Sequence, residues 1–319
     1  MGRYDFEGFA RGWFVVSFSD ELEPGEAKPL TYFGKELVLF RTASGEPKVL
    51  DAHCPHMGAH LGHGGKVEGD SIRCPFHAWS FDGDGECVEI PYAKKIPKRA
   101  QIPCWPVRER NGMIYVWHDR EKGAPDWEIP ILDGHGGDEW TPWNYGKVRI
   151  KTHPREIVEN VVDVGHFIPV HGTHVSEISN EFDRHMATQI NSGIAYPLGG
   201  GKDRYSLRAT YHGPAYQVTK MEGLLSSRLI NAHTPVGPYE LDLRFAVSLK
   251  RDGSGREDSF IEQYVENLRG GFFQDIEIWE NMQFRDAPIL CDGDGAIIKL
   301  RRWYGQFYEP RNEAEAAHA

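Results

Sequence analysis

The chain has 319 residues, of which 26% are charged and 40% hydrophobic, a composition that predicts a folded globular protein of one large or two medium-sized domains. Its formal net charge of −11 argues against nucleic acid or an anionic membrane surface as a partner. No stretch approaches the roughly 18 apolar residues of a membrane span, and the first residues lack the apolar core of a secretion signal.

The first part of the chain shows strand signals and no helical periodicity. Turn residues at Ser44–Pro47 separate two strand-like runs, and glycines punctuate a second hairpin over Gly64–Arg73. Each hairpin is therefore expected to deliver the loop that follows it. The predicted strands are Gly8–Phe18 (as a short pair), Lys35–Phe40, Val49–Leu50 and Met113–Trp117.

One cysteine and one histidine follow each hairpin: Cys54 and His56 in the first loop, Cys74 and His77 in the second. A Rieske-type [2Fe–2S] cluster has two cysteines on one iron and two histidines on the other, so two such loops facing each other satisfy it. A zinc site of two Cys and two His is the alternative, but zinc sites usually pair like with like, as in Cys-x-x-Cys. The interleaved order favours the iron–sulfur cluster.

Three cysteines remain, namely Cys87, Cys104 and Cys291. They are odd in number and have no framework spacing, which favours reduced thiols in a cytoplasmic protein.

A compact basic run, Lys94–Arg99, stands out in this acidic chain. Such a run is usually a solvated loop. The functional hypothesis is a docking patch for an acidic electron donor near the cluster, because charge steering raises association rates.

A connector rich in Pro and Gly, Asp119–Asn144, precedes the second half of the chain. A helix is predicted to begin at Pro154, which suits a first helical turn, and to end at Ile168. The end is expected there because Pro169 disfavours a helical residue before it.

This predicted helix carries Asn160, Asp163 and His166, and His171 sits just beyond its end. Spacings of three and four residues put Glu159, Asp163 and His166 on one helical face. Two neutral imidazoles plus a carboxylate, with coordination positions left open, form the facial triad of non-haem Fe(II) oxygenases. The spacing of the two histidines by itself fits a structural histidine pair equally well.

Met186–Leu249 is rich in strand signals. The clearest alternation is at Leu241–Leu249, which predicts one buried face. Tyr205–Tyr211 and Leu229–Val236 are further candidates. Several antiparallel strands curving round a long helix would enclose a cavity.

A C-terminal helix is predicted over Gly271–Phe284. Its carboxylate Asp275 lies on an otherwise apolar face, which is costly unless the group is paired or ligates a metal, so Asp275 is the candidate third ligand. Glu277 and Glu280 fall off that face and are interpreted as solvated. The apolar stripe, spaced three and four residues apart, contains Phe272, Asp275, Trp279 and Met282.

Together these motifs resemble those of the Rieske non-haem iron oxygenases. Within them, the chain is similar to the group of 3-ketosteroid 9α-hydroxylase oxygenase components and cholesterol 7-desaturases. The resemblance covers nearly the whole chain but is weak between residues 175 and 250. The matching segments outside the ligand motifs are Met57–Leu61, Ala78–Gly83, Gly83–Cys87, Ile90–Ala93, Gln274–Trp279, Arg285–Cys291 and Arg301–Tyr308.

The resemblance implies an α+β protein. Its parts would be an all-β Rieske [2Fe–2S] domain (1–120), a connector (121–145), a helix-grip, START-like catalytic domain with a curved antiparallel sheet (146–311), and a disordered tail (312–319). It also implies a homotrimer, in which Asp163 would bridge its own histidine to His77 of the neighbouring subunit. The implied site residues are Cys54, His56, Cys74 and His77 for the [2Fe–2S] cluster, His166, His171 and Asp275 for a mononuclear Fe(II), and Asp163 and Asn160 as catalytic residues.

The reaction implied is that of the terminal oxygenase component of a monooxygenase system. A reductase, directly or through a ferredoxin, would pass electrons from NAD(P)H to the cluster, and the enzyme would use O₂ to hydroxylate a hydrophobic substrate, a steroid. Desaturation of a steroid and monooxygenation or demethylation of an aromatic compound are the alternatives. An aromatic acid usually needs a buried cation, for which Arg208, Arg228 and Arg244 are candidates.

Two proteins of other classes share parts of this pattern. A Rieske electron-transfer protein needs only about a hundred residues, whereas here some two hundred more follow, with an iron-ligand pattern that a carrier does not use. A lipid- or steroid-binding helix-grip module would have a degenerate iron site, whereas all three expected ligands are present.

Overall fold

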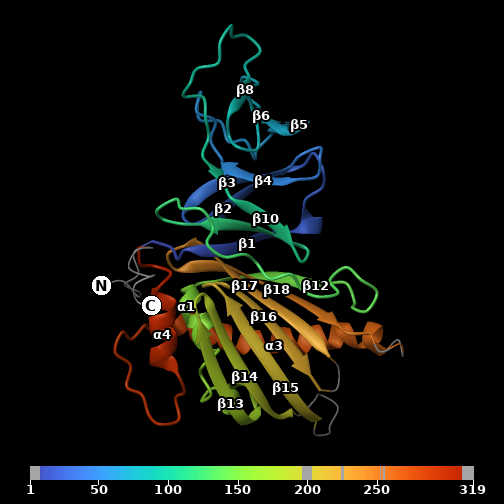
Figure 1. Cartoon of the computed structure of the whole chain (residues 1–319), viewed down its shortest axis with the longest axis vertical. Helices are drawn as coiled ribbons and strands as arrows, with labels where there is room; N and C mark the ends of the chain where they lie inside the picture. The colour runs from blue at the N-terminus through green and yellow to red at the C-terminus, as the bar shows by residue number, and fades with distance from the viewer. Residues whose placement is uncertain (1–7, 196–202, 224–225, 252, 254–255, 311–319) are drawn as a thin grey trace. The chain divides into compact units, whose positions relative to one another are not determined.

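The computed structural model describes residues 8–195, 203–223, 226–251, 253 and 256–310. The tail predicted at residues 312–319 lies outside this described part. The chain divides into two compact units, whose elements are labelled in Figure 1. The first unit comprises Trp13–Asp126 and Val236–Pro238, and the second contains the remaining described residues.

The first unit is built from three small sheets, with strand orders β1-β11-β10, β2-β3-β4-β9 and β5-β6-β7-β8. The two predicted hairpins are confirmed as the antiparallel pairs β3–β4 and β5–β6. The strand pair predicted at residues 8–18 is wrong: one strand forms there, all seven of its residues are buried, and it neighbours the distant β11 instead of a local partner. The bounds are β1 Gly12–Phe18, β2 Ala27–Tyr32, β3 Lys35–Arg41, β4 Pro47–Asp51, β5 Lys66–Glu68, β6 Ser71–Arg73, β7 Ser80–Phe81, β8 Cys87–Glu89, β9 Cys104–Trp105, β10 Val107–Arg110 and β11 Met113–His118, with a 3₁₀ turn at Ser19–Glu21.

The second unit is organised by one seven-stranded sheet of order β12-β18-β17-β16-β15-β14-β13. Strands were predicted at β15, β17 and β18, and β13 was not. The pairs β12–β18 and β13–β14 through β16–β17 are antiparallel, so a meander of hairpins makes up most of the sheet. The bounds are β12 Asn144–Ile150, β13 His174–Asp183, β14 Met186–Ala195, β15 Asp203–His212, β16 Tyr216–Glu222, β17 Ser227–Gly237 and β18 Glu240–Leu249.

The helices of this unit differ from the predicted ones. The helix predicted from Pro154 to Ile168 is two helices, α1 (Pro154–Glu159) and α2 (Phe167–His171). Pro169 is the reason: it lacks an N–H, which the first turn of a helix does not need, so it starts a new helix more readily than it ends an old one. The shared helical faces expected for residues 159–167 therefore do not exist.

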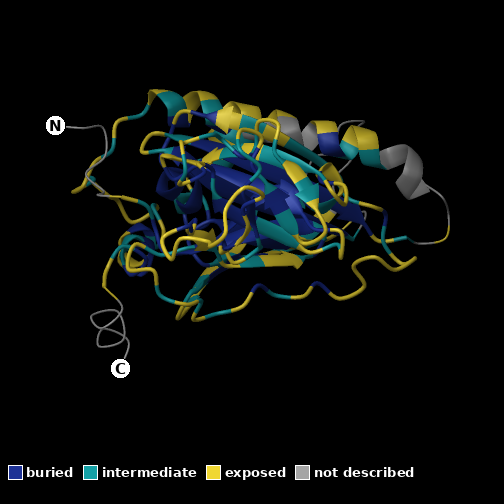
Figure 2. Cartoon of the chain, turned by 90° about the horizontal axis from the view of Figure 1, so that it is seen from above, coloured by how far each residue is buried: buried dark blue, intermediate teal, exposed yellow. Residues whose placement is uncertain are grey.

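The C-terminal helix is much longer than predicted. α3 runs over Arg256–Asn281, and a further helix, α4 (Ile297–Gly305), was not predicted. α3 packs on the sheet: Trp279 joins a core with β12 and β18, and Val265 joins a second core with β17 and β18. Figure 2 shows exposed and buried residues alternating along α3, as expected for a helix with one face on a sheet. No helix in the described part of the chain has the length and apolarity needed to cross a membrane.

Candidate metal centres

The two loops that carry Cys54 and Cys74 have matching backbone turns. The amide of Gly58 donates to the carbonyl of Cys54 at 2.9 Å, and the amide of Ala78 donates to that of Cys74 at 3.2 Å. Gly58 and Ala78 both have left-handed φ values, +77° and +58°. In each loop the cysteine amide donates in turn to the carbonyl five residues further on, at 2.9 and 2.8 Å. The sequence therefore builds one turn twice, once with Gly and once with Ala at the left-handed position.

Both thiols lie in the apolar core beneath these loops. Cys54 and Cys74 are free, and their exposed fractions are 2% and 4%. Burial, with a contribution from the neighbouring Cys74, raises the pKa of Cys54 to about 11. The thiolate is the metal-binding form of cysteine, so a thiol pair buried in this way is suited to a cationic centre that holds it deprotonated.

The two imidazoles lie beside each other and are half-buried. The ring centroids of His56 and His77 are 4.6 Å apart at 73°, and His56 is stacked on Trp79 at 4.6 Å and 7°. Nδ1 of His56 is buried without a hydrogen-bond partner. Because buried polar atoms are almost always satisfied, this nitrogen fits the position of a metal ligand. All four residues predicted for the cluster are thus brought to one end of the first unit.

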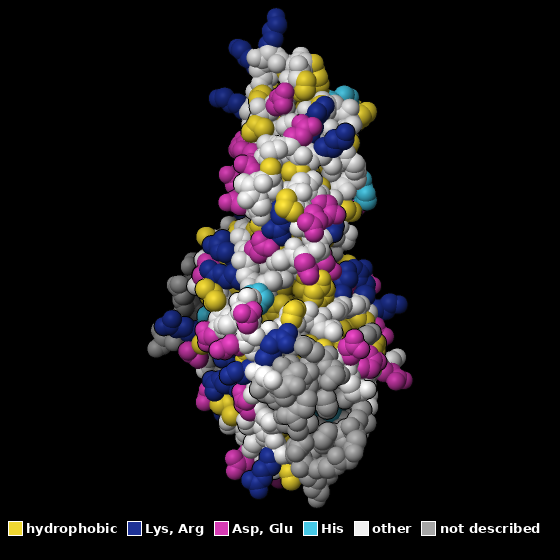
Figure 3. Space-filling model, turned by 90° about the vertical axis from the view of Figure 1, so that its right-hand side faces the viewer, with side chains coloured by type: hydrophobic (Ala, Val, Ile, Leu, Met, Phe, Trp, Pro, Cys, Tyr) yellow, Lys and Arg dark blue, Asp and Glu magenta, His cyan; other side chains and the backbone are white. Residues whose placement is uncertain are grey.

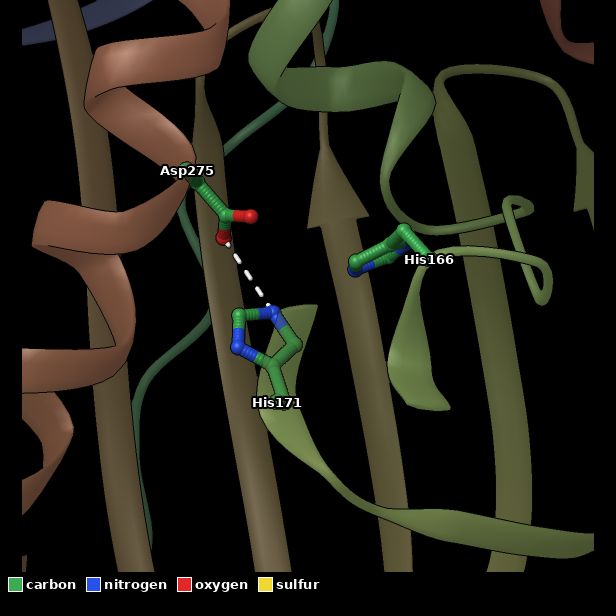
Figure 4. A group of neighbouring side chains, drawn as sticks. All are labelled: His166, His171 and Asp275. Atoms are coloured by element: carbon green, nitrogen blue, oxygen red, sulfur yellow. Dashed lines mark ion pairs between the residues drawn. The ribbon is translucent and has the colours of Figure 1, made fainter. Parts of the chain in front are cut away.

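A second group of possible ligands lies in the second unit. His166, His171 and Asp275 each offer one ligand atom, and these atoms all lie within 4.8 Å of one another. Figure 4 shows His171 on α2 and Asp275 on α3 pointing toward each other, with His166 beside them. Nε2 of His171 lies 3.4 Å from Oδ2 of Asp275, and that hydrogen bond is the main reason why the pKa of His171 is raised.

The chemistry of this group fits a divalent metal. Asp275 is only 7% exposed, as the apolar stripe predicted, and its buried carboxylate faces two imidazoles. Phe272 of that stripe has no described side chain. Two histidines and one carboxylate, with the remaining side open, form the ligand set of non-haem Fe(II) sites.

Asn160 and Asp163 both lie in the segment between α1 and α2, each near one member of this group. Nδ2 of Asn160 donates to Oδ2 of Asp275 at 3.5 Å. Oδ2 of Asp163 lies 3.4 Å from Nδ1 of His166. Burial opposes ionisation of Asp163, but its interactions with His166 outweigh this and lower its pKa. Sequence reasoning missed Gln274, whose Oε1 lies 3.4 Å from Nδ1 of His171; its place next to Asp275 was the available signal.

The sheet face that looks toward α3 carries an unexpected set of buried amides. Leu229 packs against α3 residues, and cross-strand pairing places Thr219, Gln217 and Asn231 on the same face. Pairing of β14 with β15 and of β15 with β16 adds Gln189 and Asn191 to it. The exposed fractions of the four amides are Gln189 4%, Asn191 2%, Gln217 9% and Asn231 7%.

These amides bond in pairs and leave further hydrogen-bonding atoms free. Nδ2 of Asn191 donates to Oε1 of Gln189 at 3.1 Å, and Nδ2 of Asn231 donates to Oε1 of Gln217 at 3.0 Å. Nε2 of Gln189 and the Oδ1 atoms of Asn191 and Asn231 are buried without partners. His233 on the same face bonds to the hydroxyl of Tyr211 at 2.9 Å, and burial lowers the pKa of His233 to about 3. The face therefore offers neutral donors and acceptors to a ligand.

The three arginines considered as partners of an acid lie on the opposite face. Arg208 lies opposite Lys220, and Lys220 lies opposite Arg228, on neighbouring strands. Each of them is one residue along its strand from a residue that faces α3, so they point to the other face of the sheet. Arg244 pairs with Lys147 on that same outer face. A hollow of about 430 Å³ lined by Arg208 is also on the outer face and so is not part of the group around Asp275. Among the described residues, the α3-facing side of these strands carries no Lys or Arg.

A Cys/His-lined loop pair in a small all-β unit, and a two-histidine, one-carboxylate group under a helix that grips a curved sheet, define a Rieske-type oxygenase. The comparisons with known proteins agree. Residues 12–106 match the Rieske [2Fe-2S] domain family, and residues 116–308 match the family described as 3-Ketosteroid 9alpha-hydroxylase C-terminal domain. The chain belongs to the 3-ketosteroid 9α-hydroxylase family of Rieske oxygenases.

Individual relatives support the same family. The chain is 39% identical to a 3-ketosteroid-9-alpha-monooxygenase oxygenase component of Rhodococcus rhodochrous, over 94% of this chain and 81% of the relative. It is 34% identical to a cholesterol 7-desaturase of Ciona intestinalis, over 94% and 69%. Its fold is similar to the crystal structure of dicamba monooxygenase bound to dicamba, with a TM-score of 0.78 and 20% identity over 98% of this chain and 100% of the other.

Membership confirms the predicted class and fold. The protein is an oxidoreductase, the oxygenase component of a system in which a reductase supplies electrons, and it carries a Rieske [2Fe–2S] cluster and a mononuclear iron. The catalytic domain is α+β with a large antiparallel sheet, as predicted. An isolated electron carrier is excluded because the family match continues over residues 116–308.

Proposed function

We propose that this protein is the terminal oxygenase component of a monooxygenase system that hydroxylates a steroid. Its relatives are named for a 3-ketosteroid and for cholesterol, and both kinds of substrate are large, apolar and uncharged at neutral pH. Electrons come from NAD(P)H through a reductase, directly or by way of a ferredoxin, and O₂ is the oxidant. The observation that carries the proposal is the group formed by His166, His171 and Asp275.

The same proposal assigns ligands to the two metal centres. Cys54, His56, Cys74 and His77 hold the [2Fe–2S] cluster, supported by the buried thiols and by the unpartnered Nδ1 of His56. His166, His171 and Asp275 hold the mononuclear iron. When bound, the cluster supplies stored electrons and the mononuclear iron supplies the oxygen chemistry.

Two residues of the α1–α2 segment assist the iron ligands. Asn160, through its amide, fixes the carboxylate of Asp275 so that one oxygen stays aimed at the histidines. Oδ2 of Asp163 lies 3.4 Å from Nδ1 of His166, and the carboxyl remains ionised because that histidine lowers its pKa. An ionised carboxylate next to a ligand histidine orients the ring and provides a route for charge from outside the site. We propose that in a homotrimer this route meets His77 of the neighbouring subunit.

The α3-facing side of the sheet supports a neutral substrate. An aromatic carboxylate on this side of the sheet would meet none of the three candidate cations, since Arg208, Arg228 and Arg244 are all on the other face. The free amide atoms of Gln189 and Asn231 suit an uncharged oxygen, such as a ketone or a hydroxyl, and the surrounding buried face excludes water. We expect a ketosteroid or sterol to satisfy both features.

The remaining assignments complete the proposal. We assign residues 1–120 to the Rieske domain, 121–145 to the connector and 146–311 to the catalytic domain. The enzyme works in the cytoplasm, in keeping with the free cysteines Cys87, Cys104 and Cys291.

Iron analysis combined with oxygen uptake tests this function. The oxygenase should contain three irons per chain and show O₂ uptake that depends on a reductase and is stimulated by steroids from a panel of ketosteroids and sterols. Product analysis separates hydroxylation from desaturation. Two irons per chain, or uptake stimulated only by methoxy- or N-methyl aromatics, would contradict the steroid assignment.

A further inference from the structure

An exposed loop rises from the core that holds the two cluster cysteines. Residues 91–99 are all exposed. The loop leaves the core at Ile90 and returns to it at Ala100, and both residues belong to the same buried cluster as Cys54 and Cys74. Its ends are tied by the amide of Ala93 donating to Ile90 O at 3.0 Å and the amide of Cys87 donating to Ala100 O at 3.0 Å. The loop is therefore a defined platform close to the cluster ligands.

The charges of this platform are unbalanced. Its basic residues are Lys94, Lys95, Lys98 and Arg99, and none of them forms an ion pair with any described residue. Several other basic residues of the first unit pair with acids, as Arg41 does with Glu109 and Arg73 with Glu68. Lys and Arg side chains gather at the top of Figure 3, the region of the loops that follow β8 in Figure 1. Four unpaired positive charges in a chain of net charge −11 form a surface for an acidic partner.

Apolar side chains also lie exposed on the platform. Tyr92 is 62% exposed and Ile96 42%. An exposed aromatic and an exposed aliphatic side chain with cations around them are typical of a protein interface.

Tyr92 also connects the platform to a cluster ligand. Its hydroxyl accepts a hydrogen bond from Nε1 of Trp79 at 2.8 Å, and Trp79 is stacked in parallel on His56. A partner that contacts Tyr92 is therefore connected to His56 through two side chains, Tyr92 and Trp79. His77 has no such cover: its ring lies against the exposed Phe76 at a centroid distance of 3.9 Å.

We propose that the electron donor of this oxygenase docks with an acidic face on the loop 91–99 and that the electron enters on the His56 side of the cluster, past Trp79. The inference rests on the proposed cluster ligands. The reaction is a one-electron transfer: a reduced ferredoxin-type centre of the partner is oxidised, the cluster is reduced, and no bond forms or breaks. Tyr92 acts as a positioning residue that holds the indole against His56.

The test uses holoenzyme and a reduced, acidic plant-type [2Fe–2S] ferredoxin as the probe. Cluster reduction is followed by stopped-flow absorbance, and ferredoxin binding is titrated in parallel, at ionic strengths of about 10 mM and 150 mM, where the Debye length falls from about 30 to 8 Å. We expect the double variant K94E/K95E to reduce the second-order rate constant by at least about tenfold at low salt and to weaken binding, with a flattened salt dependence. The double variant R120E/K122E, which makes the same charge change of −4 at exposed sites elsewhere in the first unit, is the control and should behave like wild type.

A second variant tests the route separately. Tyr92→Phe should leave ferredoxin affinity unchanged and lower the limiting rate at saturating ferredoxin. Reduction by dithionite, a small reductant that does not need the platform, should proceed in K94E/K95E as in wild type.

The outcomes separate the inference from the function on which it rests. Wild-type protein without the cluster absorbance would refute the ligand assignment. A coloured K94E/K95E variant with wild-type rates and salt dependence would refute the docking surface, and a wild-type limiting rate in Tyr92→Phe would refute the route past Trp79. A change of oligomeric state in K94E/K95E would show that the loop contacts another copy of this chain, and would likewise overturn docking of a donor there.

Discussion

The ion pair between Glu159 and Arg301 should decide how firmly the iron-binding segment is held. Glu159 is the last residue of α1, and the segment with Asn160, Asp163 and His166 begins directly after it. Arg301 on α4 donates to both oxygens of Glu159, Nε at 2.6 Å and Nη2 at 3.0 Å, and the two side chains are only 17% and 13% exposed.

The size of the effect follows from these contacts. Hydrogen bonds to a charged group contribute about 1.5–3 kcal/mol, and removing one partner of a buried pair costs about 3–5 kcal/mol. Glu159 keeps a second partner, since Nε of Arg155 lies 3.2 Å from its Oε1. We therefore expect Arg301→Ala to cost about 2 kcal/mol, which lowers the melting temperature of a domain of about 150–250 residues by about 4–8 °C.

Calorimetry and iron retention measure this effect. Arg301→Ala should melt earlier than wild type and lose mononuclear iron faster during dialysis against a chelator. Arg302→Ala, at the exposed neighbouring position, is the matched control. Arg301→Lys should rescue only part of the loss, because lysine keeps the charge without the two-pronged geometry. A double-mutant cycle with Glu159→Gln that gives no coupling energy, or a melting temperature equal to that of Arg302→Ala, would refute this reasoning.

Three further results are expected. Asp275→Ala should lose the mononuclear iron and keep the cluster colour, because its carboxylate is one of the three proposed iron ligands and the proposed cluster ligands lie in the other unit; normal iron content, measured by elemental analysis, would contradict the assignment. Asp163→Asn should keep both metals and lose steroid turnover, since a neutral amide cannot stabilise charge on His166; unchanged turnover coupled to the reductase would exclude the role. The free energy of unfolding should fall as the pH decreases below 6.5, because burial lowers the pKa of His153 to about 3. Between pH 6.5 and pH 3 the unfolded chain binds a proton on this histidine that the folded chain does not bind. The slope is on the order of 1.4 kcal/mol per pH unit, about 2 kcal/mol from pH 6.5 to 5, and urea melts of His153→Asn that parallel wild type over this range would contradict it.

The cluster loops could be predicted from sequence because their information is local. A cysteine and a histidine two or three residues apart must come from one loop, and the turn residues before each pair fixed the hairpins that deliver them. The α1–α2 segment was harder to predict, because local spacing identified its residues but not the backbone that carries them. Its candidate site residues Asn160, Asp163 and His166 were predicted from their spacing, but the continuous helix assumed for them was wrong, since Pro169 starts α2 and does not end α1.

The amides on the α3-facing side of the sheet could not be predicted, because these side chains are polar and yet buried. A period-two pattern tells which residues share a face and not which face is covered. Both faces of β17 are buried. Hydropathy therefore does not show which of Asn231 and Ile230 points toward α3 and which points to the opposite face. The register of four strands, β14 to β17, was needed to bring Gln189, Gln217 and Asn231 together. The beginning of α3 at Arg256 was also missed, although Ile261, Tyr264 and Val265 are spaced three and four residues apart and pack on the sheet.

The turn around Cys54 is repeated around Cys74, so the backbone of the two cluster loops is nearly symmetric. The side chains around the two histidines are not symmetric. Five residues after the first cysteine the chain has Ala59, and five after the second it has Trp79, whose ring crosses over to the first loop's histidine. A bulky ring on one flank and a methyl group on the other give the two histidines unequal surroundings, although the backbone treats them alike. A single side chain, that of Trp79, thus makes the two histidine sides of the centre different. Exchanging the residues at positions 59 and 79 is the simplest test of whether electrons pass through the centre in a preferred direction.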